Sequence, residues 1–339
     1  MINRLFGVQN KNYALHHAKR NIQLWISLAL LIIILMIYQI RSGSVLNEFQ
    51  IKVLINGGMA LSFASVGLSM IIISGGFDVS VGSIITLVNV IASITLKDQL
   101  FTDFQICLLM ILIATLTGAI NGFLIAYAGI QPIIATLASN FVWFGVSLLT
   151  LPKPGGYIPQ WINVLFQGSY IKKIPNTIFW LILLIIFGIY FQRTKFCRSI
   201  FAIGSDPEAA HRNGIDIKFT LLKVYALAGL FYGISGLFLT AQTTSGDPNI
   251  GIAFMLLGFS AVVVGGTPLG GGRGSLFSGI IGAYIIRLLD SMLISIGATS
   301  YSNDIFQGSI LLIAVAINSL MPKIKMMIGK GRKSEKFAQ

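Results

Sequence analysis

Apolar runs long enough to cross a lipid bilayer recur along almost the whole 339-residue chain. Hydrophobic residues make up 55% of it and charged residues only 10%, which leaves too little polar surface to enclose a soluble core. At about 20 residues per crossing, the runs are 22–40, 51–74, 79–96, 104–128, 132–151, 177–191, 219–241, 250–266, 275–298 and 303–321. The sequence therefore predicts an all-α, polytopic transmembrane helix bundle of about ten helices.

The lysines and arginines between these runs predict the orientation of the bundle. Sixteen of them lie in the terminal segments and the loops on the same side, and six lie in the opposite loops. Because cytoplasmic segments carry the excess of positive charge, we expect both termini in the cytoplasm. The chain then divides into a cytoplasmic N-terminal segment (1–21), a transmembrane domain (22–321) and a basic cytoplasmic tail (322–339). Its longest loops are cytoplasmic at 192–218 and extracytoplasmic at 152–176.

Composition also excludes several classes of function. The net charge of +13 does not indicate nucleic-acid binding, because the basic residues cluster in the loops where a membrane protein needs them. Two cysteines lack metal-ligand spacing, and the three histidines lie away from the apolar runs. The glycine-rich segment 265–275 has arginine where a nucleotide-binding loop needs lysine. We therefore expect a non-catalytic chain with no metal site and no cofactor of its own, and interpret 265–275 as a turn or a ligand contact.

The segment SGGFDVSVGS (74–83) interrupts two apolar runs with a glycine pair and an acid. A buried carboxylate is costly in lipid, so Asp78 is a functional candidate. Interrupted helices line the substrate cavity of many transporters, which makes Gly75, Gly76, Asp78 and Ser80 a candidate substrate pathway. The alternative is a structural cap, in which the Asp78 carboxylate accepts from the first amides of the next helix.

Two further patterns concern helix packing. Arg287 and Asp290 are three residues apart in the ninth run, so they share a helix face and can form an intramembrane ion pair or serve a functional site. Glycines repeat at four-residue spacing at 118 and 122 and again at 229 and 233. Such spacing lets two helix backbones approach closely.

The loop 192–218 contains a helix-start pattern in DPEAAHRNG. Asp206 can cap the helix, Pro207 suits its first position, and Gly214 can end it. The sequence therefore predicts a helix of about two turns on the cytoplasmic face. It is either an ordinary surface helix or a rigid contact for a peripheral partner.

Four segments in the same order resemble the permease subunits of bacterial ATP-binding cassette (ABC) importers for simple sugars, the ribose and galactose group. SGGFDVSVGS is similar to that family's SGGIDLSVGS, and AVVVGGTPLGGGRGS is similar to its AVVIGGTSLSGGRGS. GIQPIIATLASNFVWFG resembles its Pro-Phe-Ile-x-Thr-Leu segment, and AIGSDPEAAHRNGI resembles its loop Ala-x-Gly-Gly-Asn-Pro-Glu-Ala-Ala-Arg-x-Ser-Gly-Ile. Together they cover the region from about residue 50 to 320.

The resemblance implies that Glu208, Ala209, Ala210 and Gly214 belong to a coupling helix that docks on a separate ABC ATPase, which binds ATP and Mg²⁺. It also implies an extracytoplasmic solute-binding protein, a second permease copy or paralogue, and alternating access in a bacterial cytoplasmic membrane. The expected cargo is a monosaccharide or a related small polar solute.

Three departures from the family pattern concern the cargo. Met255–Ser260 replace the family's Glu-Leu-Asp-Ala-Ile-Ala, Phe144 replaces an arginine, and Arg287 with Asp290 stand where small and amide residues are usual. The alternatives are therefore a nucleoside, a signalling furanose or a branched-chain amino acid as cargo. A different class of protein, an ion-coupled secondary transporter, is the alternative to an ABC importer.

Overall fold

The computed structural model describes residues 22–41, 47–169 and 174–295, together with residues 297, 305, 308, 309 and 312. The three continuous stretches are helical almost throughout, as the sequence predicts. In chain order the helices are α2 (Ile22–Arg41), α3 (Glu48–Ile73), α4 (Val81–Thr95), α5 (Leu100–Ala126), α6 (Pro132–Thr150), α7 (Gln160–Gln167), α8 (Thr177–Gln192), α9 (Lys195–Ser205), α10 (Pro207–Arg212), α11 (Ile217–Thr243), α12 (Ile252–Val264) and α13 (Leu276–Ser295).

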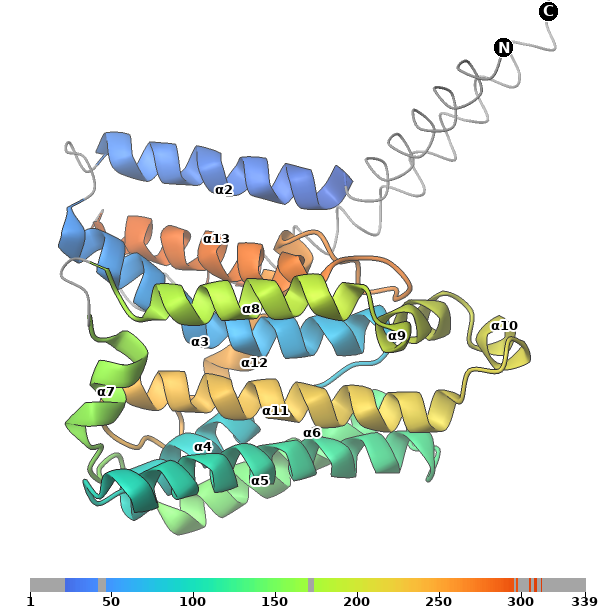
Figure 1. Cartoon of the computed structure of the whole chain (residues 1–339), viewed down its shortest axis with the longest axis horizontal. Coiled ribbons are helices and arrows are strands. Elements are labelled where there is room, and N and C mark those ends of the chain that lie inside the picture. Colours follow the sequence, from blue (N-terminus) through green and yellow to red (C-terminus); the bar gives the residue numbers. More distant parts are fainter. Residues whose placement is uncertain are drawn as a thin grey trace, which may run out of the picture.

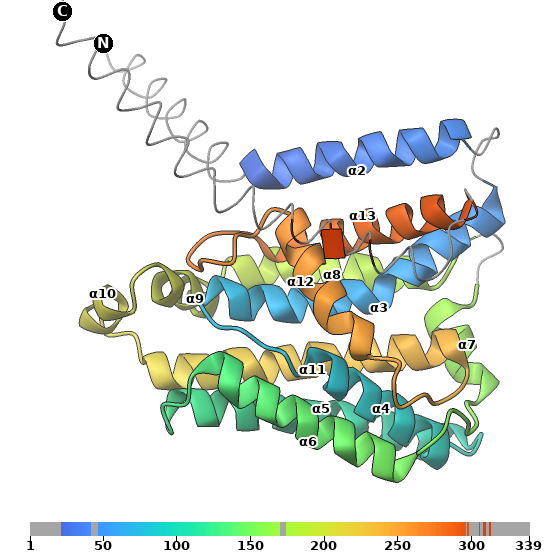
Figure 2. The same cartoon turned by 180° about the vertical axis from the view of Figure 1, so that it is seen from behind.

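The long helices lie roughly alongside one another, with α2 on one side of the bundle and α5 and α6 on the other (Figure 1). α3 and α11 are the central helices, and most of their side chains are buried. α7 and α10 stand at opposite ends of the bundle. Seen from behind, α4 and α12 cross the middle of the molecule obliquely (Figure 2).

The described residues confirm fewer membrane-spanning helices than the sequence predicts. In the part of the chain that the structure describes, six helices are long and apolar enough, or seven if α8 and α9 form one span bent by 72°. The third and eighth predicted runs form the short helices α4 and α12, of 15 and 13 residues. At about 1.5 Å per residue these are shorter than a hydrocarbon core of about 30 Å. The count of about ten is therefore not confirmed.

Three predictions concern residues that the structure does not describe. The first is that both termini lie in the cytoplasm, the second is the division into segments 1–21 and 322–339, and the third is almost all of the tenth run, at 303–321. The break between the second and third runs is confirmed, since α3 ends at Ile73 and α4 begins at Val81.

α5 and α11 approach each other as their glycine spacing predicts. A Cβ atom added at Gly118 would lie 2.3 Å from the carbonyl oxygen of Tyr225, and one at Gly229 would lie 2.2 Å from that of Ala114. Real Cβ atoms do not come this close to backbone oxygen, so each position requires glycine. The small residues therefore set the distance between these two helices.

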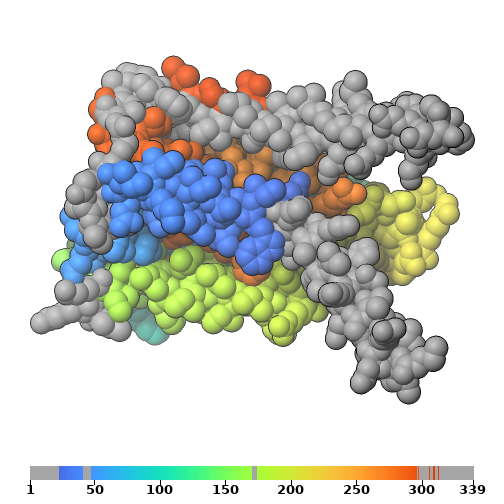
Figure 3. All heavy atoms as spheres, turned by 90° about the horizontal axis from the view of Figure 1, so that it is seen from above, coloured from blue at the N-terminus to red at the C-terminus, as the bar shows by residue number. Residues whose placement is uncertain are grey.

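α2 lies on the outside of the bundle, along one face (Figure 3). Most of its side chains are exposed, including Trp25 and Ile40. It is joined to the rest by contact with α13 and by Ser27, whose hydroxyl donates to the Val264 carbonyl at 2.8 Å. An apolar helix exposed in this way requires lipid or another chain around it.

Candidate functional site

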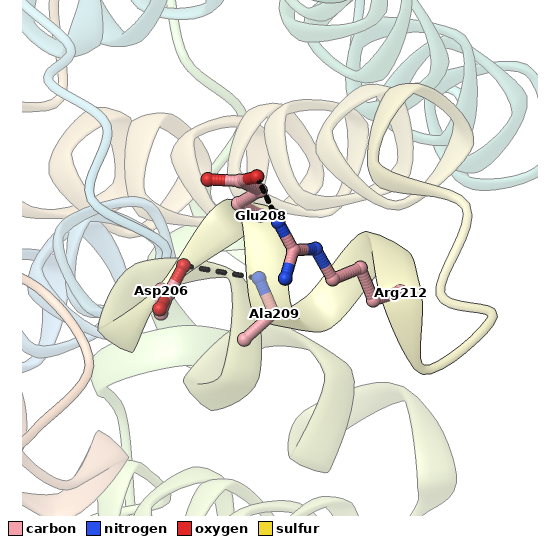
Figure 4. A network of polar contacts seen from close by, with 4 residues as sticks. All are labelled: Asp206, Glu208, Ala209 and Arg212. Atoms are coloured by element: carbon pink, nitrogen blue, oxygen red, sulfur yellow. Dashed lines mark hydrogen bonds and ion pairs between the residues drawn. The ribbon is translucent and has the colours of Figure 1, made fainter.

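α10 begins with a complete N-terminal cap. Asp206 has an extended backbone, and its carboxylate accepts a hydrogen bond from the Ala209 N–H at 3.0 Å (Figure 4). Pro207 occupies the first helical position, where no backbone donor is needed. Glu208 places an acid in the first turn, near the positive end of the helix dipole. The predicted start of this helix is confirmed.

The end of α10 also follows the prediction. Gly214 adopts a left-handed backbone with φ of 78°, and its N–H donates to the His211 carbonyl at 2.9 Å. The side chains of Glu208 and Arg212 form an ion pair across one turn, and both are mostly exposed. Only Ala210 is buried among the six residues of the helix. α10 is therefore a short helix that stands out from the end of the bundle, and its coupling role stays a prediction.

α9 connects α10 to the bundle and was not predicted. Its start is capped by Thr194, whose hydroxyl accepts from the Cys197 N–H at 3.1 Å. Cys197, Ile200 and Ile203 lie on one face and are buried against the bundle. The sequence contains a pattern that could have predicted this helix, because these three apolar residues are each three positions apart, as in an amphipathic helix.

The α3–α4 break is held by hydrogen bonds to three other helices. Asp78 is fully buried, and its Oδ1 accepts from both the N–H (2.8 Å) and the hydroxyl (2.6 Å) of Ser80. Asn121 of α5 donates its side-chain N–H to the Ser80 hydroxyl at 2.9 Å. Thr136 of α6 accepts from the Val79 N–H, and Tyr225 of α11 donates to the Phe77 carbonyl.

The four predicted pathway residues separate into two environments. Gly75 is exposed and has φ of 82°, and Gly76 is half-buried, with no room for a Cβ beside the Tyr225 hydroxyl. Asp78 and Ser80 are buried, and Asp78 accepts from the Ser80 N–H, which is a contact that the structural alternative expects. Asp78 is not itself the cap of α4, because Ser80 holds that position and makes no side-chain cap bond. A role in the substrate pathway stays a prediction for all four.

One side of this cluster brings a carboxylate and a phenol together. Within the described residues, the Asp78 carboxylate and the Tyr232 hydroxyl of α11 are both fully buried and interact with each other. Neither Asp78 Oδ2 nor the Tyr232 hydroxyl makes a hydrogen bond of good geometry, and the same is true of Asn121 Oδ1. The sequence did not identify four residues of this cluster, because the groups that they contact are far away along the chain. These residues are Asn121, Thr136, Tyr225 and Tyr232.

The glycine-rich segment 265–275 forms the turn between α12 and α13. Gly266, Gly271, Gly272 and Gly274 all have positive φ, between 65° and 125°, which only glycine adopts readily. Thr267 lies inside the turn and accepts from the Ser275 N–H at 3.2 Å. The turn interpretation is confirmed.

Arg287 and Asp290 lie one turn apart on α13, and both are half-buried. The guanidinium group of Arg287 packs on Gly57 of α3, where an added Cβ would lie 2.2 Å from Nε. The end of the arginine side chain can move aside, so this contact does not by itself require glycine at position 57. Pairing between Arg287 and Asp290 stays a prediction.

The described residues contain no group of three His, Cys, Asp or Glu side chains arranged to hold a metal ion. The site consists instead of apolar helices, an interrupted helix with a buried polar cluster, and a capped helix exposed at one end. Such features are found in membrane transport proteins.

Comparison with known proteins gives the family. The chain belongs to the family described as branched-chain amino acid transport system / permease component, whose model matches residues 51–315. The ribose import permease protein of Bacillus subtilis is 32% identical over 299 residues, which cover 85% of this chain and 90% of that protein.

Two other relatives match most of the chain. The ribose import permease protein of Haemophilus influenzae is 30% identical over 269 residues, which cover 77% of this chain and 82% of that protein. The galactose/methyl galactoside import permease protein of Salmonella typhimurium is 27% identical over 311 residues, covering 86% and 92%. No solved structure gives a significant match. The resemblance to sugar-importer permeases drawn from the four motifs is thus confirmed.

Proposed function

We propose that this chain is the membrane-spanning permease subunit of an ABC importer that carries a monosaccharide or a related small polar solute. The family assignment supports the permease class, and the relatives named as ribose and galactose permeases support the sugar cargo. The six or seven helices of the described residues that are able to cross a bilayer fit a multi-pass membrane protein. The proposal places it in the bacterial cytoplasmic membrane with both termini inside, as the distribution of basic residues suggests.

α10 is the single observation that carries the mechanism. An isolated helix of six residues is not stable in water, yet this one has a side-chain cap, a first-turn proline and a terminating glycine. Its exposed side chains are held in one geometry and make little contact with the rest of the chain. Such an element is suited to fit rigidly into the groove of another protein.

The proposal assigns ATP hydrolysis to a partner. A separate ABC ATPase binds ATP and Mg²⁺ and docks on the coupling helix α10, which contains Glu208, Ala209 and Ala210 and ends before Gly214. The exposed residues among them face the ATPase, whereas the buried Ala210 holds the helix to the permease. This permease subunit is non-catalytic and pairs with a second copy or a paralogue, while an extracytoplasmic solute-binding protein delivers the cargo. Closure of the ATPase pair moves α10, and the bundle alternates between outward-open and inward-open states.

Uptake into proteoliposomes tests this function. The permease is reconstituted with its ATPase and its solute-binding protein, and the uptake of labelled ribose, galactose and allose is measured with and without ATP. We expect uptake of one of these sugars only when the ATPase and ATP are both present. Equal uptake without the ATPase would reject the importer mechanism and favour an ion-coupled secondary transporter.

A second candidate keeps this mechanism and changes the cargo. A relative named as an autoinducer 2 import system permease protein, from Salmonella paratyphi A, is 27% identical over 298 residues, and the family description itself names branched-chain amino acids. Thermal-shift measurements on the solute-binding protein with sugars, nucleosides, signalling furanoses and branched-chain amino acids separate these cargoes. The largest stabilisation identifies the cargo class.

A further inference from the structure

The end of α9 meets two distant parts of the chain through backbone atoms. A Cβ added at Gly204 would lie 1.9 Å from the Ile73 carbonyl oxygen and 2.5 Å from the Gly272 nitrogen. Ile73 is the last residue of α3, before the α3–α4 break, and Gly272 lies in the turn between α12 and α13. Gly204 is two residues from Asp206, the cap of α10.

Hydrogen bonds join the same three segments. The Gly272 N–H donates to the Ile73 carbonyl at 2.8 Å, and the Ser205 hydroxyl contacts the Gly272 carbonyl at 3.3 Å. A Cβ at Gly271 would lie 2.9 Å from the Cα of Gly75. We call this set of contacts the glycine junction. Its residues are Gly204, Ser205, Ile73, Gly75, Gly271 and Gly272.

Contacts between backbones differ mechanically from contacts between side chains. A long side chain can absorb a displacement by changing rotamer, whereas two backbones in van der Waals contact must move together or separate. A shift of the α9 end therefore requires the α3–α4 break either to move with it or to separate from it.

The break in turn is attached to the interior helices. Its Phe77 carbonyl accepts from Tyr225 of α11, and Val79 donates to Thr136 of α6. Ser80 accepts from Asn121 of α5. A displacement at the glycine junction thus acts on a segment that is bonded to three helices of the bundle.

We propose that Gly204 is a positioning residue for coupling, and that the glycine junction conveys movement of α10 to the α3–α4 break. This inference rests on the proposed docking of an ATPase on α10. In this inference the coupling path runs through three backbone segments that are far apart in the sequence: the end of α9, the start of the α3–α4 break and the turn between α12 and α13. The close contact with the Ile73 carbonyl also explains why glycine stands inside α9, where alanine forms the better helix.

Gly204→Ala tests the proposal, with Gly270→Ala as its matched control. Gly270 lies in the same glycine turn, and a Cβ there meets no atom within 4 Å. Each variant is assembled with the ATPase and the solute-binding protein in proteoliposomes. ATPase binding, ATP hydrolysis and solute uptake are measured on the same samples.

We expect Gly204→Ala to bind the ATPase and hydrolyse ATP while solute carried per ATP falls by about tenfold, with Gly270→Ala unchanged. A merely structural defect would instead lower binding, hydrolysis and uptake together. Coupling in Gly204→Ala within about twofold of the wild type would overturn the proposal. If the wild-type permease binds no ATPase, the proposed function fails and not this inference alone.

Hydrogen exchange on the unmodified complex decides the matter if Gly204→Ala does not fold. The complex is compared with and without a non-hydrolysable ATP analogue. We expect the analogue to change amide exchange at 206–214 and also at 73–76 and 271–272. A change confined to 206–214 would overturn the proposal.

Discussion

Removing the cap of α10 is expected to weaken the binding of the ATPase. Asp206→Ala deletes the carboxylate that accepts from the Ala209 N–H at 3.0 Å. The Asp206 N–H donates to the Ala202 carbonyl through the backbone, so α9 keeps its own last hydrogen bond. The substitution therefore acts on the start of α10.

The size of the effect follows from the cost of a lost N-cap. Such a loss destabilises a helix by about 1 kcal/mol, which is about a fivefold change in an equilibrium constant. α10 has six residues and buries only Ala210, so little else compensates for the missing cap. Because the proposed docking needs the folded helix, its affinity falls in proportion to the folded fraction, and we expect a loss of up to about fivefold.

The assay is equilibrium binding of the ATPase to the permease in lipid nanodiscs. Asp206→Asn is the matched control, because asparagine caps as well as aspartate but carries no charge. We expect wild-type affinity from Asp206→Asn and weaker binding from Asp206→Ala. Equal affinity for all three proteins would refute the role of the cap, and equal losses in both variants would show that charge matters instead.

Three further outcomes are expected. Glu208→Lys places a positive charge at the positive end of α10 and should abolish ATP-dependent uptake while the permease keeps its wild-type melting temperature; normal uptake would contradict the coupling assignment. Gly118→Ala should lower the free energy of unfolding by about 1–3 kcal/mol, because its Cβ would lie 2.3 Å from a backbone oxygen. Gly145→Ala is the control and should leave stability unchanged, because its Cβ would meet no atom within 4 Å. Asp78→Ala should lower the free energy of unfolding by about 1–3 kcal/mol, because it leaves the buried Ser80 donors without an acceptor. Asp78→Asn keeps that acceptor and should lower it less in the same melting assay.

Local signals in the sequence were enough to predict several elements. Asp206, Pro207 and Gly214 define the two ends of α10, because caps and left-handed glycines depend on residues close in sequence. The α3–α4 break was also visible, since a glycine pair and an acid interrupt two apolar runs. The glycine spacing on α5 and α11 predicted a close helix contact without naming the two partners.

Long-range contacts could not be predicted in the same way. Nothing near Asn121 or Thr136 indicates that each bonds to the α3–α4 break, and nothing near Gly204 indicates a contact with Gly272. Hydrophobicity also made α4 and α12 look like full spans, because an apolar run does not reveal where its helix ends. The count of about ten is not confirmed at these two helices for that reason.

The central claim is that α10 receives mechanical work from a separate ATPase, and cross-linking in the working transporter tests it most directly. Ala209→Cys places a thiol on the exposed face of α10, while the native Cys107 and Cys197 are buried. In proteoliposomes that carry out ATP-dependent uptake, we predict cross-linking of this cysteine to the ATPase subunit. Uptake that proceeds normally with no cross-link from position 209 to the ATPase would contradict the claim.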